Sequence, residues 1–91
     1  MTIKRIQDRI RNRKYRFSDH SVKRMIKRNV TRQEVEGALL AGEIIEEYSD
    51  DKYSPSCLIY GKTEVGRDLH IQVSYPPSVV VITVYQPDPE E

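Results

Sequence analysis

The hydrophobic period of this chain changes once, near Gly42, and that change restricts the fold more than any other feature. Before Gly42, apolar residues recur every three or four positions, which is typical of amphipathic helices. After Gly42 they alternate with polar residues, which is typical of strands. Helices followed by strands predict an α+β fold, with the helices on one face of an antiparallel sheet. We therefore expect one domain, residues 1–91, with two to three N-terminal helices and a four-stranded antiparallel meander.

Three helical segments precede Gly42. The first covers about residues 1–14 and is followed by a short extended link at residues 15–17. The second runs from Ser18 to about Asn29, and the third begins at Thr31, whose hydroxyl can form a capping box with Glu34. We expect the third helix to end at Gly42 in the left-handed conformation. The side chains expected to face the core are Ile3, Ile6 and Ile10, then Val22, Met25 and Ile26, then Val35, Ala38 and Leu39.

Four strands are expected after Gly42, at residues 43–48, 57–62, 69–75 and 79–85. A loop at 49–56, a turn at 64–68 and Pro76–Pro77 separate them, and an acidic tail follows at 87–91. Alternation along the third strand places His70 on the face opposite Leu69 and Ile71. A two-residue connection at Pro76–Pro77 would pair His70 with Thr83, whereas a one-residue slip would pair Thr83 with Ile71. We favour the first register, which gives an open sheet face that carries His70, Gln72, Thr83 and Tyr85.

Charge is strongly segregated along the chain. Residues 1–32 hold twelve Lys or Arg and two acids, a net charge of +10, whereas residues 33–91 hold three bases and twelve acids, a net charge of −9. Such asymmetry indicates a polyanionic partner for the basic part, such as nucleic acid. The alternative is a fold that pairs a basic layer with an acidic one, although surface ion pairs contribute little stability.

Composition excludes several classes of protein. The single cysteine, Cys57, permits neither an intramolecular disulfide nor a cysteine-based zinc site. No apolar run follows the N-terminal charges as in a signal peptide, and no apolar stretch is long enough to span a bilayer. We expect a cytoplasmic protein with no metal and no cofactor.

Two groups of residues have the chemistry for cutting RNA without a metal. His20, Arg24 and Arg28 recur every four positions and form one stripe of the second helix, which suits a phosphate. The open sheet face adds a second imidazole, His70, so that a proton acceptor, a proton donor and cations are all available. Tyrosines could stack on the bases of a single strand; they are Tyr60, Tyr75 and Tyr85. The alternative for the helix stripe is a solvated basic face with an incidental histidine. The alternative for the sheet face is a structural histidine at His70 and ordinary sheet aromatics.

These motifs resemble one known family. They are Phe17-Ser18-Asp19-His20-Ser21, Arg24-Met25, Arg28, Val30 to Val35, Ala38-Leu39, Gly42, Ile44 to Tyr48, Leu69-His70-Ile71 and Ile82 to Pro89. The pattern is similar to the domain-of-unknown-function 4258 family over residues 15–91, with the first helix outside the family core. The resemblance implies a RelE/barnase-like fold, shared with RelE-like and colicin-like ribonuclease toxins. It also implies a protein partner, a zinc-finger antitoxin of the MqsA kind.

The resemblance and the motifs together predict a toxin-like, metal-independent endoribonuclease of a bacterial toxin–antitoxin pair, acting on RNA that is free or bound to the ribosome. The predicted catalytic residues are His70, His20, Arg24, Thr83 and Tyr85. The predicted RNA- or phosphate-binding residues are Arg28, Lys27 and Arg67. Two alternatives stay open: a non-catalytic RNA- or protein-binding module that uses the basic helices, and a subunit whose acidic half docks a basic protein.

Overall fold

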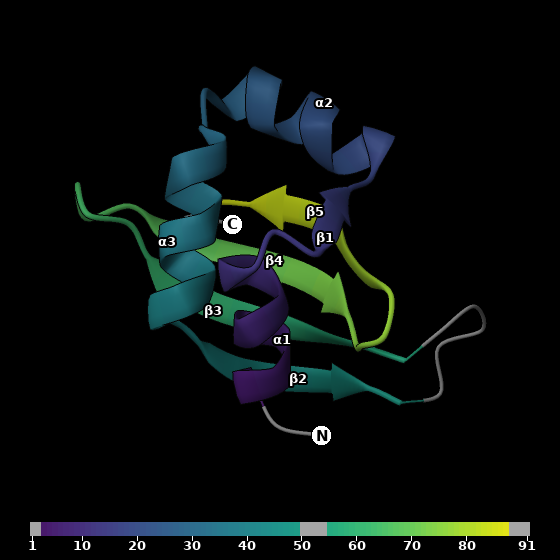
Figure 1. Cartoon of the computed structure of the whole chain (residues 1–91). Helices are drawn as coiled ribbons and strands as arrows, with labels where there is room; N and C mark the ends of the chain where they lie inside the picture. Colours follow the sequence, from purple (N-terminus) through teal and green to yellow (C-terminus); the bar gives the residue numbers. More distant parts are fainter. Residues whose placement is uncertain (1–2, 50–54, 88–91) are drawn as a thin grey trace.

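The computed structural model of the chain describes residues 3–49 and 55–87 (Figure 1). Residues 50–54 of the predicted loop and 88–91 of the predicted tail lie outside this described part. No helix within 3–49 and 55–87 is long and apolar enough to cross a membrane. The elements are α1 (Ile3–Arg11), β1 (Tyr15–Phe17), α2 (Asp19–Arg28), α3 (Arg32–Ala41), β2 (Glu43–Tyr48), β3 (Ser56–Lys62), β4 (Asp68–Ser74) and β5 (Val79–Tyr85).

The fold is α+β, and β2 to β5 form an antiparallel meander as the sequence predicts. The prediction of four strands is wrong, however, because the sheet has five strands in the order β1-β5-β4-β3-β2. The expected link at residues 15–17 is β1, which pairs in parallel with β5. Three residues are too few to show a strand period, and parallel pairing with a distant strand leaves no local signal.

One face of the sheet is covered by α1 and α3 (Figure 1). The Gln7 side-chain amide donates to the carbonyls of Leu39 and Leu40, at 3.1 Å each, and so ties α1 to the last turn of α3. The core lies between this helical layer and the sheet. Its fully buried apolar members are Ile6, Ile10, Val35, Ala38, Leu39, Cys57, Ile59, Leu69, Ile71, Val73, Val81 and Val84.

The contact of α3 with β3 depends on two glycines. A Cβ atom at Gly61 would lie 2.0 Å from the Ala38 carbonyl oxygen, so only glycine allows α3 to approach this closely. A Cβ atom at Gly42 would lie 2.6 Å from the carbonyl oxygens of Ala38 and Tyr60. The predicted left-handed conformation of Gly42 is wrong, because its φ of −91° and ψ of −179° are extended. Gly42 is therefore required because α3 and β3 pack closely around it. Its backbone conformation would allow any residue.

The orientation of α2 also differs from the prediction. Of the three residues predicted to face the core, Met25 is buried as predicted, but Val22 and Ile26 are 41% and 75% exposed. Ser21 is the other buried residue of this helix. The reason is position: α2 lies at the edge of the sheet and contacts mainly β5, so only a narrow stripe of the helix is covered (Figure 1).

Hydrogen bonds at both ends place α2 beside the second half of β5. The Ser18 amide donates to the Val81 carbonyl at 3.0 Å, and the Ser18 hydroxyl donates to the Ile82 carbonyl at 2.8 Å. At the other end, Arg67 connects the last carbonyls of α2 to Gln86, which follows β5. Ten helical residues span about 15 Å, and the strand from residue 82 to 86 spans about 13 Å. The helix and the strand therefore match in length and run together.

Candidate functional site

The β4–β5 register brings His70 opposite Tyr85 and Gln72 opposite Thr83. The predicted pairing of His70 with Thr83 is therefore wrong. Two features move the register by one residue each: Val73 pairs with Val81, whereas a two-residue connection would pair it with Val80, and a bulge on β5 leaves Ile82 as an extra residue between Val81 and Thr83. The two displacements together preserve the alternation of faces. His70, Gln72, Thr83 and Tyr85 consequently share one face, as the sequence analysis expects.

Two tyrosines flank the half-buried imidazole of His70. The Tyr85 hydroxyl is 3.3 Å from Nδ1, and the two rings are 5.2 Å apart with an interplanar angle of 64°. Tyr60 lies directly opposite His70 on β3, with its ring 5.8 Å away at 83°. Both contacts are edge-to-face, a favourable arrangement for aromatic rings. The imidazole is therefore oriented from both neighbouring strands, on the sheet face away from α1 and α3.

Asp68 extends this cluster and is not among the site residues predicted from the sequence. The Tyr60 hydroxyl donates to Asp68 Oδ1 at 2.7 Å, and Lys62 Nζ is 3.7 Å from the same oxygen. The hydrogen bond to Asp68 raises the pKa of Tyr60, so the tyrosine stays a neutral donor. A signal was present in the sequence, since Asp68 precedes His70 by two positions and must point to the same face.

Tyr75, which was grouped with Tyr60 and Tyr85 as a base-stacking residue, has a different environment. Its hydroxyl donates to Glu47 Oε1 at 2.7 Å, and its ring packs against the core. Burial and the Glu47 carboxylate raise the pKa of Tyr75. Tyr60 and Tyr85 are therefore the members of that group that contact His70.

The predicted residues of α2 differ in exposure. His20, Lys27 and Arg28 are exposed, whereas Arg24 is half-buried. The Nε atom of Arg24 is buried and has no hydrogen-bond partner among the described residues. A buried donor without a partner is uncommon in native structures, and a bound anion or water that supplies the acceptor is one explanation for it.

Arg67 is engaged in contacts that hold the fold. Its guanidinium donates to the carbonyls of Arg28 and Asn29, at 2.9 Å each, and to the side chains of Glu34 and Gln86, at 3.4 and 3.3 Å. A cation at the C-terminal end of a helix also complements the helix dipole. These contacts give Arg67 a structural task, and its predicted contact with phosphate stays a prediction.

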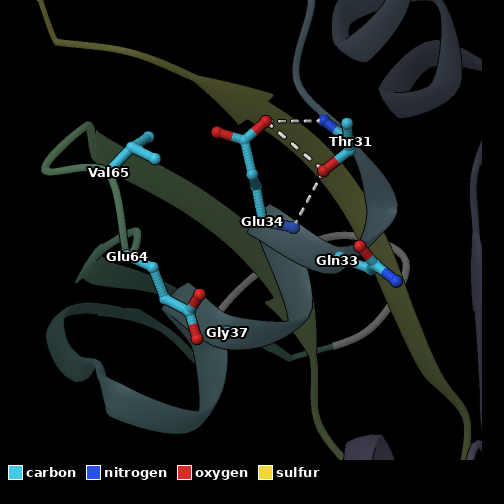
Figure 2. A pocket seen from close by; sticks show the side chains of 6 residues that line it. All are labelled: Thr31, Gln33, Glu34, Gly37, Glu64 and Val65. Atoms are coloured by element: carbon cyan, nitrogen blue, oxygen red, sulfur yellow. Dashed lines mark hydrogen bonds between the residues drawn. The ribbon is translucent and has the colours of Figure 1, made fainter.

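A shallow hollow of about 290 Å³ lies between α3 and the turn that joins β3 to β4 (Figure 2). Figure 2 shows the capping box at its rim, where Thr31 and Glu34 exchange the hydrogen bonds predicted for them. None of the sequence-predicted site residues lines this hollow. Its lining residues are Thr31, Gln33, Glu34, Gly37, Glu64 and Val65.

The fold and the site together describe a small α+β domain whose mixed sheet carries a histidine–tyrosine cluster on the face away from the helical layer. A family model described as a domain of unknown function (DUF4258) matches residues 17–86, and the chain belongs to this family. No curated protein and no solved structure matches the chain. The match includes α2 and all of the cluster around His70, and it leaves α1 outside.

Proposed function

We propose that this protein is a metal-independent endoribonuclease that acts on single-stranded RNA. The observation that carries the proposal is the imidazole of His70, held between Tyr60 and Tyr85 on an open sheet face. The helix with the basic stripe runs beside the strand that carries Tyr85. A titratable group, fixed cations and aromatic rings are the components that RNA cleavage without a metal requires.

The reaction is an internal transfer at phosphorus and needs no further reactant. The ribose 2′-oxygen bonds to the adjacent phosphorus, the bond from phosphorus to the 5′-oxygen breaks, and a 2′,3′-cyclic phosphate results. One group accepts the proton of the 2′-hydroxyl, and another gives a proton to the departing 5′-oxygen. We assign these two tasks to His70 and His20.

Tyr85 suits either task of His70. A phenol both donates and accepts, so its hydroxyl can bond to Nδ1 in either neutral tautomer. When Tyr85 donates to Nδ1, Nε2 carries the proton that the leaving oxygen requires. When Nδ1 donates to Tyr85, Nε2 is free to accept the proton of the 2′-hydroxyl.

The remaining roles concern charge and orientation. Arg24 and Arg28 would balance the charge that develops on the phosphoryl oxygens, with Lys27 as a further phosphate contact. The unpartnered Nε donor of Arg24 supports this role, because an anion would supply the missing acceptor. Thr83, which shares the face of His70, would orient the substrate.

The pattern of ion pairs supports a polyanionic partner. Of the twelve bases in residues 1–32, only Arg11 and Arg32 form ion pairs within 3–49 and 55–87, with Asp8 and Glu36. The alternative of a basic layer neutralised by the chain's own acidic layer finds little support in this pattern. The basic groups are therefore available to phosphates.

The family resemblance adds the biological setting to the proposal. Helices that precede an antiparallel sheet suit the RelE/barnase-like fold of ribonuclease toxins. The proposed setting is the bacterial cytoplasm, where a zinc-finger antitoxin would restrain the nuclease.

The test is incubation of the purified protein with end-labelled RNA in EDTA. We expect products that end in a 2′,3′-cyclic phosphate, with cleavage at least about a hundredfold slower in His70→Ala, since general acid–base catalysis contributes roughly that much. Tyr75→Phe is the control, because its hydroxyl contacts Glu47 and no residue of the cluster. If His70→Ala and Arg24→Ala proteins stay folded and cleave at the wild-type rate, the assignment is wrong.

The unpaired basic groups favour a second candidate as well, an RNA-binding module without catalysis. This function needs the basic surface but not an oriented imidazole. It predicts salt-sensitive binding of RNA that stays intact, and the same incubation therefore distinguishes the two functions.

A further inference from the structure

The basic residues of α1, β1 and the link between them form a surface of their own. Those with exposed side chains are Lys4, Arg5, Arg11, Arg13, Lys14 and Arg16, and we call this set the α1–β1 surface. We propose that the α1–β1 surface binds the phosphate backbone of RNA outside the site at His70. The inference deepens the proposed function, on which its choice of RNA rests. It concerns a segment that lies almost wholly outside the family match at residues 17–86.

The packing of α1 keeps its basic side chains outward. Ile6 and Ile10 are 0% and 1% exposed, and Gln7 is bonded to the end of α3. The helix is therefore fixed by its apolar side, while Lys4 and Arg5 project to solvent. A fixed array of cations binds a polyanion with less loss of side-chain and backbone freedom than a disordered arm.

The same packing argues against a membrane as the partner. An amphipathic helix that binds a bilayer inserts its apolar face among the lipids. In α1 that face is already buried against α3 and the core by Ile6 and Ile10. Only the basic face is left, and this face suits phosphates.

The position of β1 connects the α1–β1 surface to the sheet face of His70. Tyr15 and Phe17 pack against the core, so Arg16 between them points to the opposite face of the sheet. That face is the one that carries Thr83 and Tyr85 on the neighbouring strand β5. The α1–β1 surface therefore extends from the helical layer, across the edge strand β1, to the sheet face of His70. An RNA strand seated at His70 reaches α1 over this edge.

This path makes a prediction about RNA length. A short strand covers only the His70 face, whereas a longer one also reaches α1. Single-stranded sites span about 4 to 16 nucleotides, so labelled oligomers at these two lengths are the probes. The fourfold variant Lys4→Gln/Arg5→Gln/Lys14→Gln/Arg16→Gln removes four charges of the α1–β1 surface. The comparison variant, Lys23→Gln/Lys27→Gln, removes two exposed charges of α2.

Binding is measured by fluorescence anisotropy over a range of salt concentrations, with His70→Ala as the background so that RNA stays intact. We expect the fourfold variant to bind the long oligomer at least about tenfold more weakly and to reduce its salt slope by about 3, as for four lost phosphate contacts. The short oligomer should be bound as before. The α2 comparison variant should weaken both lengths alike.

The outcomes separate this inference from the proposed function. A fourfold variant that binds the long oligomer with the affinity and salt slope of the His70→Ala background overturns the inference. Equal losses for the long and short oligomers also overturn it, because they show no dependence on reach. If wild-type protein cleaves no RNA but the length-dependent loss is observed, the nuclease fails while the α1–β1 surface stands.

Discussion

Tyr85 lies directly opposite His70 on the neighbouring antiparallel strand, with its hydroxyl 3.3 Å from the imidazole Nδ1. Tyr60 stands opposite the same histidine on the other side, but its hydroxyl is bonded to Asp68. The two tyrosines are therefore alike in ring contact and different in hydrogen bonding. Variants at the two tyrosines can therefore distinguish the effect of the hydrogen bond to His70 from the effect of ring packing around it.

Tyr85→Phe should slow RNA cleavage while leaving the fold intact. The variant keeps the ring contact and loses the hydrogen bond to Nδ1, which is worth about 0.5–1.5 kcal/mol, or roughly two- to tenfold in rate. The measurement is the cleavage rate at saturating RNA. Tyr60→Phe is the control, because it loses the same atom without affecting a bond to His70. Equal rate losses in the two variants would contradict an orienting role for Tyr85.

Arg67→Ala should destabilise the protein by about 1–3 kcal/mol, because it removes a charged donor from the carbonyls of Arg28 and Asn29. Arg67→Lys should recover little, since a single ammonium lacks the fork that bonds several acceptors. Urea unfolding measures the loss. If Arg67→Ala weakens RNA binding with unchanged stability, the phosphate role predicted from the sequence outweighs the structural one.

Gly61→Ala should be strongly destabilising, because its Cβ would lie 2.0 Å from the Ala38 carbonyl oxygen. Overpacking of this kind costs about 1–3 kcal/mol or more. The matched control is Gly37→Ala on α3, where a Cβ meets nothing within 4 Å. That change should stabilise the helix by about 0.5–1 kcal/mol. Urea midpoints that fall by similar amounts in both variants would show that the close approach of α3 to β3 is not the cause.

Stability should fall as pH rises from about 10 to 12, and Tyr15 should contribute to the fall. Burial, with a smaller effect of the Glu36 carboxylate, raises the pKa of Tyr15 from 10.0 to about 12. Above pH 10 the unfolded chain loses this proton while the folded chain keeps it, so the unfolded state is favoured. The contribution is complete below pH 10 and is lost as pH rises through 12.

Tyr15→Phe isolates this effect from that of the other tyrosines. The hydroxyl of Tyr15 is buried and has no hydrogen-bond partner among the described residues, so its removal should cost little or even stabilise at neutral pH. Urea midpoints at about pH 8 and pH 11 provide the comparison. We expect a smaller drop between them in Tyr15→Phe than in the wild type; an equal drop would show that Tyr15 is not responsible.

Local sequence determined the elements and the faces of the strands. The capping box of Thr31 and Glu34 formed as predicted, and β2 and β5 have the predicted bounds. The alternation that separates His70 from Ile71 also holds, because it depends only on the geometry of an extended chain. Each of these features depends on residues a few positions apart, so the printed sequence contains its cause.

Features that depend on contacts between distant residues were decided only by the tertiary structure. The pairing of β1 with β5, the exposure of Val22 and Ile26, and the choice of Tyr85 opposite His70 all depend on residues far apart in the chain. The register moved because the turn after β4 places Val81, instead of Val80, opposite Val73, and because a bulge on β5 adds one more residue. Neither feature has a period that the sequence displays. The alternation in the sequence therefore determined that His70, Gln72, Thr83 and Tyr85 share one sheet face, whereas the pairing of strands decided which of them touch.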